Sequence, residues 1–244
     1  GYRDVAKAMQ NEGEHLIRIE ASGICGSDMH AYLGHDNRRP APLILGHEAA
    51  GVIEGGPEAG RRVTINPLVT CRRCKACTTG RENLCAERQI ISMPPREGAF
   101  AQYVAMPDSN LVTVPDGVPL AKAALTEPLA VSWHAVRLAL EALHQDMDRS
   151  ALVLGGVAIG LAAALALRAM GVEDVTVLEP NETRRRFLAE RCGQVVTHEG
   201  KSPAPIVIDA VGYATTRAMA SQLAMPGGVI AHVGLGEDSG GLDI

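Results

Sequence analysis

The sequence has few aromatic residues and fewer basic than acidic side chains. Phe, Trp and Tyr make up 3% of its 244 residues, and 23 Lys and Arg stand against 28 Asp and Glu, for a formal net charge of -5. Proteins that bind nucleic acid need cations along the phosphate backbone and rings on which bases can stack. The composition therefore argues against nucleic acid as a partner.

Long uncharged runs are scarce as well. Residues 150–167, between Arg149 and Arg168, carry no charge and just reach the roughly 18 residues at which a membrane-spanning helix becomes possible. Glycines interrupt this run, so a buried strand, a glycine turn and a buried helix explain it better. Residues 1–4 include charges and no apolar stretch of the signal-peptide type. We therefore expect no membrane partner, no signal peptide and a cytoplasmic location.

Cysteine is limited to six residues, four of which lie close together in the sequence: Cys71, Cys74, Cys77 and Cys85. Four thiols at this spacing match the tetrahedral sulfur set of a structural Zn²⁺. A pair of disulfides is the alternative, but two-residue gaps would strain such bridges, and the chain does not resemble a secreted disulfide scaffold. We predict a structural-zinc lobe at 71–85, in which the metal supplies folding energy that polar residues cannot.

Two other segments carry metal-binding side chains. Residues 23–30 read Gly-Ile-Cys-Gly-Ser-Asp-Met-His, a predicted turn with a thiol, a hydroxyl, a carboxylate and an imidazole. His47 and Glu48 stand side by side before an apolar strand at 51–53, where one side chain can bind a metal while the other binds or orients it. Simpler explanations exist: Cys25 as a small buried hydrophobe, and a solvated His-Glu pair.

The first half of the chain reads as irregular β structure. Short strand patterns bounded by Gly, Pro or Asp occur at 15–22, 62–65, 100–104 and 111–114. They suit a barrel-like domain that carries metal-binding loops. A helical pattern begins near Thr126 and continues through Leu140, with Pro128 in its first turn. Helix capping alone could explain Glu127.

From residue 151 onward, buried strands alternate with helices. The strands are predicted at 151–154, 175–179, 206–209 and 229–233. Between the second and third strands a charged helix runs from about 182 to 192, with Asn181 as N-cap and Gly193 as its stop. Such alternation predicts a parallel sheet with helices on both faces.

A glycine turn and a following acid point to dinucleotide binding. A G-x-G-x-x-G pattern would place glycines at 155, 157 and 160, with an acid at Glu179 that holds the adenosine ribose hydroxyls. Position 157 is Val, whose branched side chain should push a pyrophosphate away or shift the turn, although Gly156 adds flexibility. The predicted cofactor-binding set is Gly155, Val157, Ala158, Ile159, Gly160, Glu179 and Arg184.

Together these motifs resemble the medium-chain, zinc-dependent alcohol and polyol dehydrogenases, most closely the sorbitol- and butanediol-type branch. The resemblance is carried by 23–30, 46–48, the four lobe cysteines, 126–129 and the strand-turn-helix from 151. It implies an α/β protein with a GroES-like, irregular β-barrel catalytic domain at 1–133 and a doubly wound, Rossmann coenzyme domain at 134–244. It also implies that parts of the family fold at both ends lie outside this chain.

The resemblance also implies roles for individual residues. Cys25 and His47 would be ligands of a catalytic zinc, Glu48 a third ligand or an orienting acid, and Glu127 an acid facing the metal or its water. Ser27 would take the proton of the substrate, and His30 would pass it towards solvent.

The implied activity is hydride transfer between a secondary alcohol, diol or polyol and NAD, with two zinc ions per chain and a dimeric or tetrameric assembly. NAD is expected rather than NADP because the Glu179 carboxylate would repel a 2′-phosphate. The alternative is a non-catalytic or impaired zinc-binding relative or fragment with weak nucleotide binding, which Val157 motivates.

Overall fold

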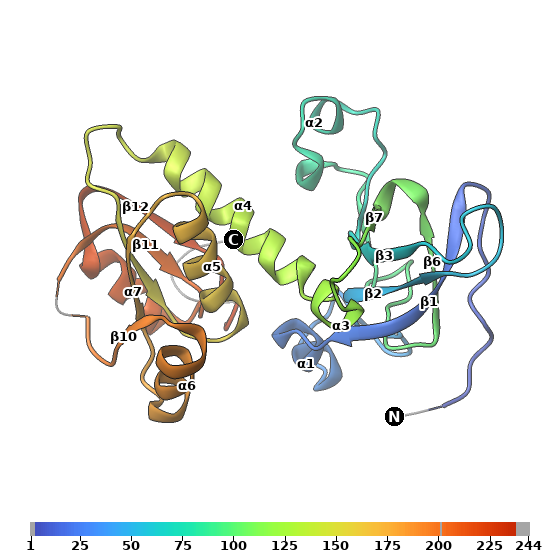
Figure 1. Cartoon of the computed structure of the whole chain (residues 1–244), viewed down its shortest axis with the longest axis horizontal. Coiled ribbons are helices and arrows are strands. Elements are labelled where there is room, and N and C mark those ends of the chain that lie inside the picture. Colours follow the sequence, from blue (N-terminus) through green and yellow to red (C-terminus); the bar gives the residue numbers. More distant parts are fainter. Residues whose placement is uncertain (1–2, 201, 238–244) are drawn as a thin grey trace. The chain divides into compact units, whose positions relative to one another are not determined.

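The computed structural model describes residues 3–200 and 202–237, and the chain divides into two compact units, residues 1–127 and 128–244 (Figure 1). The boundary falls in the first turn of helix α4 (Thr126–Ala142). The predicted boundary between 133 and 134 lies later in the same helix, because an uninterrupted helix leaves no break in the sequence. Both predicted domains also include residues outside the described part, namely 1–2, 201 and 238–244.

The first unit is built on a five-stranded antiparallel sheet in the order β6-β1-β2-β3-β7. Its strands are β1 (Glu14–Gly23), β2 (Glu48–Ile53), β3 (Arg62–Ile65), β6 (Tyr103–Pro107) and β7 (Leu111–Thr113). Apolar side chains from one face of these strands form a core that includes Ile17, Ile53, Val63, Val104 and Met106. The predicted irregular β domain is confirmed.

Short elements join these strands: α1 (Gly26–Tyr32), β4 (Leu68–Val69), α2 (Lys75–Thr78), η1 (Glu82–Leu84), β5 (Gln89–Ile90), η2 (Asp108–Asn110) and α3 (Leu120–Ala123). The prediction of a turn at 23–30 was wrong for most of that segment, since α1 begins at Gly26. Cys25 is its N-cap, and the Asp28 side chain accepts the backbone N–H of Cys25 at 3.0 Å. An acid three residues after the cap is a helix-start signal, so the sequence did contain the clue.

The second unit is a parallel sheet in the order β10-β9-β8-β11-β12. Its strands are β8 (Ser150–Leu154), β9 (Asp174–Leu178), β10 (Val195–Thr197), β11 (Ala204–Asp209) and β12 (Ala224–His232). The order reverses between β8 and β11, which is where a doubly wound sheet binds its ligand, at the carboxyl ends of the strands. The predicted parallel fold is confirmed, while β10 was missed because it has only three residues.

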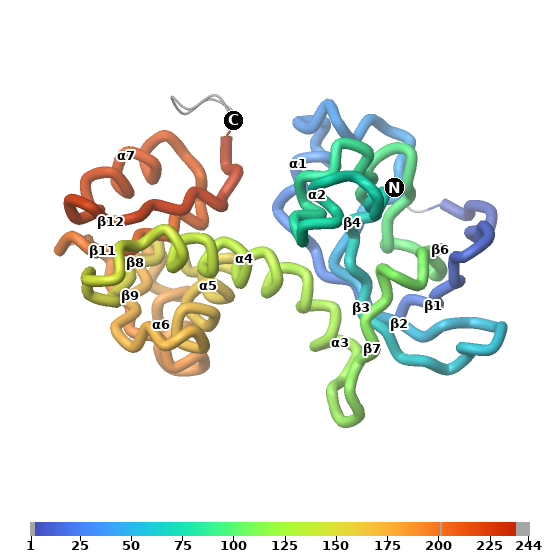
Figure 2. Tube along the Cα trace, turned by 90° about the horizontal axis from the view of Figure 1, so that it is seen from above, coloured from blue at the N-terminus to red at the C-terminus, as the bar shows by residue number. Residues whose placement is uncertain are grey.

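Helices cover both faces of this sheet. Residues of α4, α5 (Ala158–Ala169) and α6 (Glu182–Cys192) pack on one face, and α7 (Ala214–Leu223) packs on the other (Figure 2). The end signals of α6 act as predicted: Asn181 accepts the backbone N–H of Arg184, and Gly193 adopts a left-handed φ of 63°. No helix within the described residues is long and apolar enough to cross a membrane.

Candidate metal centres and nucleotide loop

The four predicted zinc-lobe cysteines converge on one point. The Sγ atoms of Cys74 and Cys77 lie 3.5 Å apart, those of Cys71 and Cys85 3.6 Å, and those of Cys71 and Cys77 4.0 Å. Tetrahedral sulfurs at a Zn–S distance of about 2.3 Å would be about 3.8 Å from one another. Disulfide bonds need about 2.05 Å, and all six cysteines are free thiols. The lobe therefore fits zinc, and the disulfide interpretation fails.

The electrostatics of the lobe also suit a cation. Backbone N–H groups of Arg73 and Cys74 lower the pKa of Cys71 to about 7. Loss of solvent and the nearby thiol of Cys74 raise the pKa of Cys77 to about 11. Without a metal the sulfurs cannot all be ionised together, because each thiolate opposes the next. A divalent cation removes that opposition.

A second cluster joins Cys25, His47 and Glu48, whose ligand atoms all lie within 4.8 Å of one another. The sheet brings them together, because β1 pairs with β2 in a register that places Gly23 opposite Glu48. A Cβ at Gly23 would meet the Glu48 carboxylate and force it to move, so glycine leaves room for Glu48 in its present position. A thiolate, an imidazole and a carboxylate match the three-ligand sets that catalytic zinc sites use, in which a fourth position stays open.

The buried carboxylate of Asp28 lies next to the imidazole ring of His47. The carboxylate is 2% exposed, and its Oδ1 lies 3.3 Å from Nδ1 of His47. Burial lowers the pKa of His47, but Asp28 and Cys25 outweigh it and raise that pKa to about 10. With Nδ1 facing Asp28, Nε2 is the nitrogen left for a metal. No role was predicted for Asp28, because no local feature of the sequence indicates that it lies next to His47.

Burial and neighbouring charges favour the neutral, protonated form of the acids at this site. Burial raises the pKa of Glu48, and the negative charge of Asp28 adds to this effect. Burial also raises the pKa of Glu127, with further contributions from Glu48 and Asp28 and an opposing one from His47. Glu127 is thus in electrostatic reach of the cluster but is not one of its three close ligands. The clustered carboxylates are a further feature that a divalent cation would stabilise.

The two predicted proton-relay residues have different surroundings. The Ser27 hydroxyl accepts a hydrogen bond from Nη1 of Arg39 at 3.2 Å. Burial raises the pKa of the nearby Cys25 thiol, but His47 and Ser27 outweigh this effect and leave that pKa below its ordinary value. His30 is exposed, with its ring 6.5 Å from that of His35. Within the described part of the chain, no hydrogen bond joins Ser27 to His30.

In the loop at the start of α5, two of the three expected glycines are present, and the backbone requires both of them. Gly155 has φ of 90°, and a Cβ at Gly160 would collide with the carbonyl oxygen of Gly155, so both positions need glycine. Val157 is the N-cap residue, with φ of -87° and ψ of -164°, a conformation open to any residue. Its side chain is 59% exposed at the helix N-terminus. The backbone therefore tolerates Val157, whose exposed side chain stands at the helix N-terminus.

Glu179 lies directly beneath this loop. It is 1% exposed, and its Oε2 accepts the backbone N–H of Gly156 at 2.9 Å. Its Oε1 accepts the N–H of Asn181 at 2.9 Å and lies 3.4 Å from Nη1 of Arg184. The predicted acid and the glycine loop are thus one hydrogen-bonded unit, with the Arg184 guanidinium at its exposed edge.

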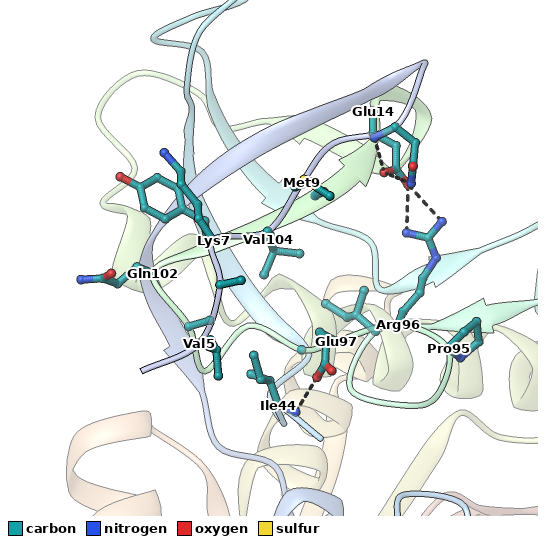
Figure 3. Close-up of a pocket in the computed structure, with 18 of the residues that line it drawn as sticks. Val5, Lys7, Met9, Glu14, Ile44, Pro95, Arg96, Glu97, Gln102 and Val104 are labelled. Atoms are coloured by element: carbon teal, nitrogen blue, oxygen red, sulfur yellow. Dashed lines mark hydrogen bonds and ion pairs between the residues drawn. The ribbon is translucent and has the colours of Figure 1, made fainter. Parts of the chain in front are cut away.

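A groove of about 530 Å³ in the first unit lies elsewhere, between the N-terminal segment and β6 (Figure 3). Two of its charged side chains are paired: Arg96 binds Glu14 at 3.1 Å, and Glu97 accepts the N–H of Ile44 at 2.6 Å. None of the candidate metal ligands lines it. The groove and the Cys25 cluster are therefore separate features of the first unit.

Comparison with known proteins gives similarities along most of the chain. The alcohol dehydrogenase GroES-like domain family matches residues 11–116. L-galactonate-5-dehydrogenase of Escherichia coli (strain K12) is 35% identical over 243 residues, covering 92% of this chain and 69% of that protein. Sorbitol dehydrogenase of Bacillus subtilis (strain 168) is 39% identical over 185 residues, covering 70% of this chain and 50% of that protein.

Solved structures of other dehydrogenases share the fold of this chain. A crystal structure of a zinc-binding dehydrogenase from Sinorhizobium meliloti 1021, bound to NADP, superimposes with a TM-score of 0.84 at 30% identity. The match covers 96% of this chain and 74% of that one. The chain thus spans between half and three quarters of the length of these three proteins.

Proposed function

This chain belongs to the zinc-dependent medium-chain alcohol and polyol dehydrogenases, and on that premise we propose that it transfers hydride between a secondary alcohol, diol or polyol and NAD. The observation that carries the proposal is the convergence of Cys25, His47 and Glu48, with ligand atoms within 4.8 Å of one another. This donor set leaves a coordination position for substrate. It lies in the part of the chain that matches the GroES-like family.

In the proposed reaction, an alcohol and NAD⁺ give a carbonyl compound, NADH and a proton. A zinc ion, when bound, supplies a Lewis acid that lowers the pKa of the alcohol hydroxyl. Cys25, His47 and Glu48 would hold it, with Glu127 facing it. Ser27 Oγ would accept the hydroxyl proton and release its own hydroxyl proton, while the carbinol C–H bond breaks and its electron pair leaves as hydride for the nicotinamide. No direct hydrogen bond joins Ser27 to His30, both of which the structure describes, so the released proton would reach the exposed His30 through solvent.

The second zinc ion of the proposal belongs to the four-cysteine lobe. The sulfur distances of 3.5 to 4.0 Å support a closed tetrahedral site, which has no position for substrate and therefore acts on stability alone. We assign two zinc ions to each chain on these two donor sets.

NAD binding is assigned to the second unit. The α5 N-terminus, from Ala158 through Gly160, has no side-chain cap, which suits a pyrophosphate. Glu179 supports NAD over NADP through its negative charge, and Arg184 would contact the adenosine ribose. Because the Sinorhizobium meliloti relative binds NADP, both coenzymes belong in the test.

We further propose that the chain acts as a homo-oligomer, a dimer or tetramer, in the cytoplasm, without a nucleic-acid or membrane partner. The six free thiols support a reducing compartment. The formal net charge of -5 disfavours a phosphate backbone.

The activity is tested by assaying a panel of polyols, diols and simple secondary alcohols for NADH formation, with NADP⁺ in parallel. We expect NADH from at least one alcohol, little turnover with NADP⁺, and two zinc atoms per chain by elemental analysis. Zinc-loaded protein that oxidises none of the alcohols with either coenzyme would contradict the proposal.

Val157 provides a separate prediction. Replacing Val157 by Gly should tighten NADH binding roughly tenfold, or about 1.4 kcal/mol, because the exposed side chain no longer stands between the α5 N-terminus and a phosphate. Val157→Ala should give an intermediate affinity, and isothermal titration calorimetry measures both. Equal affinities for all three proteins would show that the side chain does not obstruct the cofactor.

A further inference from the structure

The loop between α1 and β2 contains a buried arginine, Arg39, which is 8% exposed. Arginine is rarely buried unless its guanidinium is paired, because removing the charge from water costs several kcal/mol. Arg39 was not singled out by its sequence, since the neighbouring Arg38 looks the same. In the structure the two differ, because the Arg38 side chain is 65% exposed and that of Arg39 only 6%.

One nitrogen of Arg39 reaches two residues of the proposed active site. Nη1 donates to Ser27 Oγ at 3.2 Å and to Asp28 Oδ1 at 3.5 Å. The other side of the guanidinium faces Asp36, with Nε 3.6 Å from Oδ2. Arg39 therefore links the hydroxyl that would accept the substrate proton to the carboxylate behind His47.

Asp28 is fixed from several other directions. It accepts the backbone N–H of Cys25 at 3.0 Å and that of Gly46 at 3.2 Å. The Ser92 hydroxyl lies 3.4 Å from the same Oδ1 that faces Arg39. Ser92 is fully buried and has φ of 67°, a left-handed conformation that costs energy in a residue other than glycine. Such strain persists only where surrounding contacts fix the residue, so we expect the hydrogen-bond network around Asp28 to be rigid.

We propose that Arg39 is a positioning residue that fixes Ser27 and Asp28 relative to each other, an inference that rests on the proposed function. Its N–H occupies one lone pair of Ser27 Oγ, which sets the direction of the other lone pair. The second lone pair is then already directed to accept the alcohol proton, and the Ser27 side chain need not rotate first. Through the same nitrogen, Asp28 keeps its Oδ1 on Nδ1 of His47, so the metal ligand and the proton acceptor are aligned together.

The test is a double-mutant cycle between Arg39 and Ser27. Arg39→Met, of similar length but without donors, should lower kcat roughly tenfold with KM changed less than about twofold, and Arg39→Lys should recover part of the loss. In a Ser27→Ala background, either Arg39 substitution should lower kcat by a clearly smaller factor than in the parent protein, because only its contact with Asp28 remains. Arg191→Met, at an exposed arginine in the last turn of α6, is the control and should match the parent protein.

Additive losses in the cycle would overturn the proposal, because Arg39 would then act independently of Ser27. Crystal structures of Arg39→Lys and Arg39→Met provide a readout that does not need turnover: we expect the Ser27 side chain to change rotamer or become disordered. Unmoved Ser27 and Asp28 side chains would reject the positioning role. If the parent protein oxidises no alcohol, the proposed function fails, while these structures still decide the role of Arg39. If Arg39→Met does not fold, Arg39→Lys carries the cycle.

Discussion

Cys85→Ser should remove the metal of the four-cysteine lobe and lower the melting temperature of the first unit by roughly 10 °C or more. Cys77 and Cys85 are the only buried residues between 71 and 88, so this segment has almost no apolar core of its own. Structural zinc contributes about 10 to 16 kcal/mol of apparent binding free energy in small zinc domains. A lobe without that contribution should unfold and become sensitive to proteases.

The measurements are elemental zinc content, differential scanning calorimetry and limited proteolysis. Zinc should fall by one atom per chain, and the new cleavage sites should map to 71–88. Cys192→Ser, at the end of α6, removes a cysteine outside both clusters and should change neither zinc content nor melting temperature. A Cys85→Ser protein that keeps its full zinc content and its stability would show that the lobe is held by packing.

The parts of the fold that could be predicted are those with local signals. Asn181 and Gly193 mark the ends of α6 because each meets a need of the helix backbone at its own position. The zinc lobe could be predicted for a similar reason, since a ligand set confined to 71–85 leaves few ways to arrange four thiols. Local chemistry decides the structure in both cases.

The support of the second metal cluster could not be predicted, because it depends on contacts between distant segments. Asp28 meets His47 only when α1 lies against the start of β2, and Ser92 reaches the same carboxylate from 64 positions away. Arg39 differs from Arg38 only through burial. The sequence shows the side chains that could bind a metal, but not those that hold them in place.

Cys25→Ala should lower kcat/KM by at least about a thousandfold, or about 4 kcal/mol of transition-state stabilisation. It removes the only sulfur ligand of the Cys25, His47 and Glu48 set, and the two remaining donors cannot hold zinc firmly or orient an alcohol oxygen. Stability should change little, because Cys25 is a half-buried helix cap and sulfur is only a weak hydrogen-bond acceptor.

The measurement combines kinetics with zinc content. Cys25→Ala should keep the zinc atom of the lobe and lose the other, and its melting temperature should stay close to that of the parent protein. Cys192→Ser serves again as the cysteine control and should retain both metals and full activity. The two cysteine variants thus separate the clusters: Cys85→Ser loses stability together with its metal, and Cys25→Ala loses turnover with its own. If Cys25→Ala retained both zinc atoms and normal turnover, the catalytic metal would have to lie elsewhere, although the family membership, which rests on the whole fold, would stand.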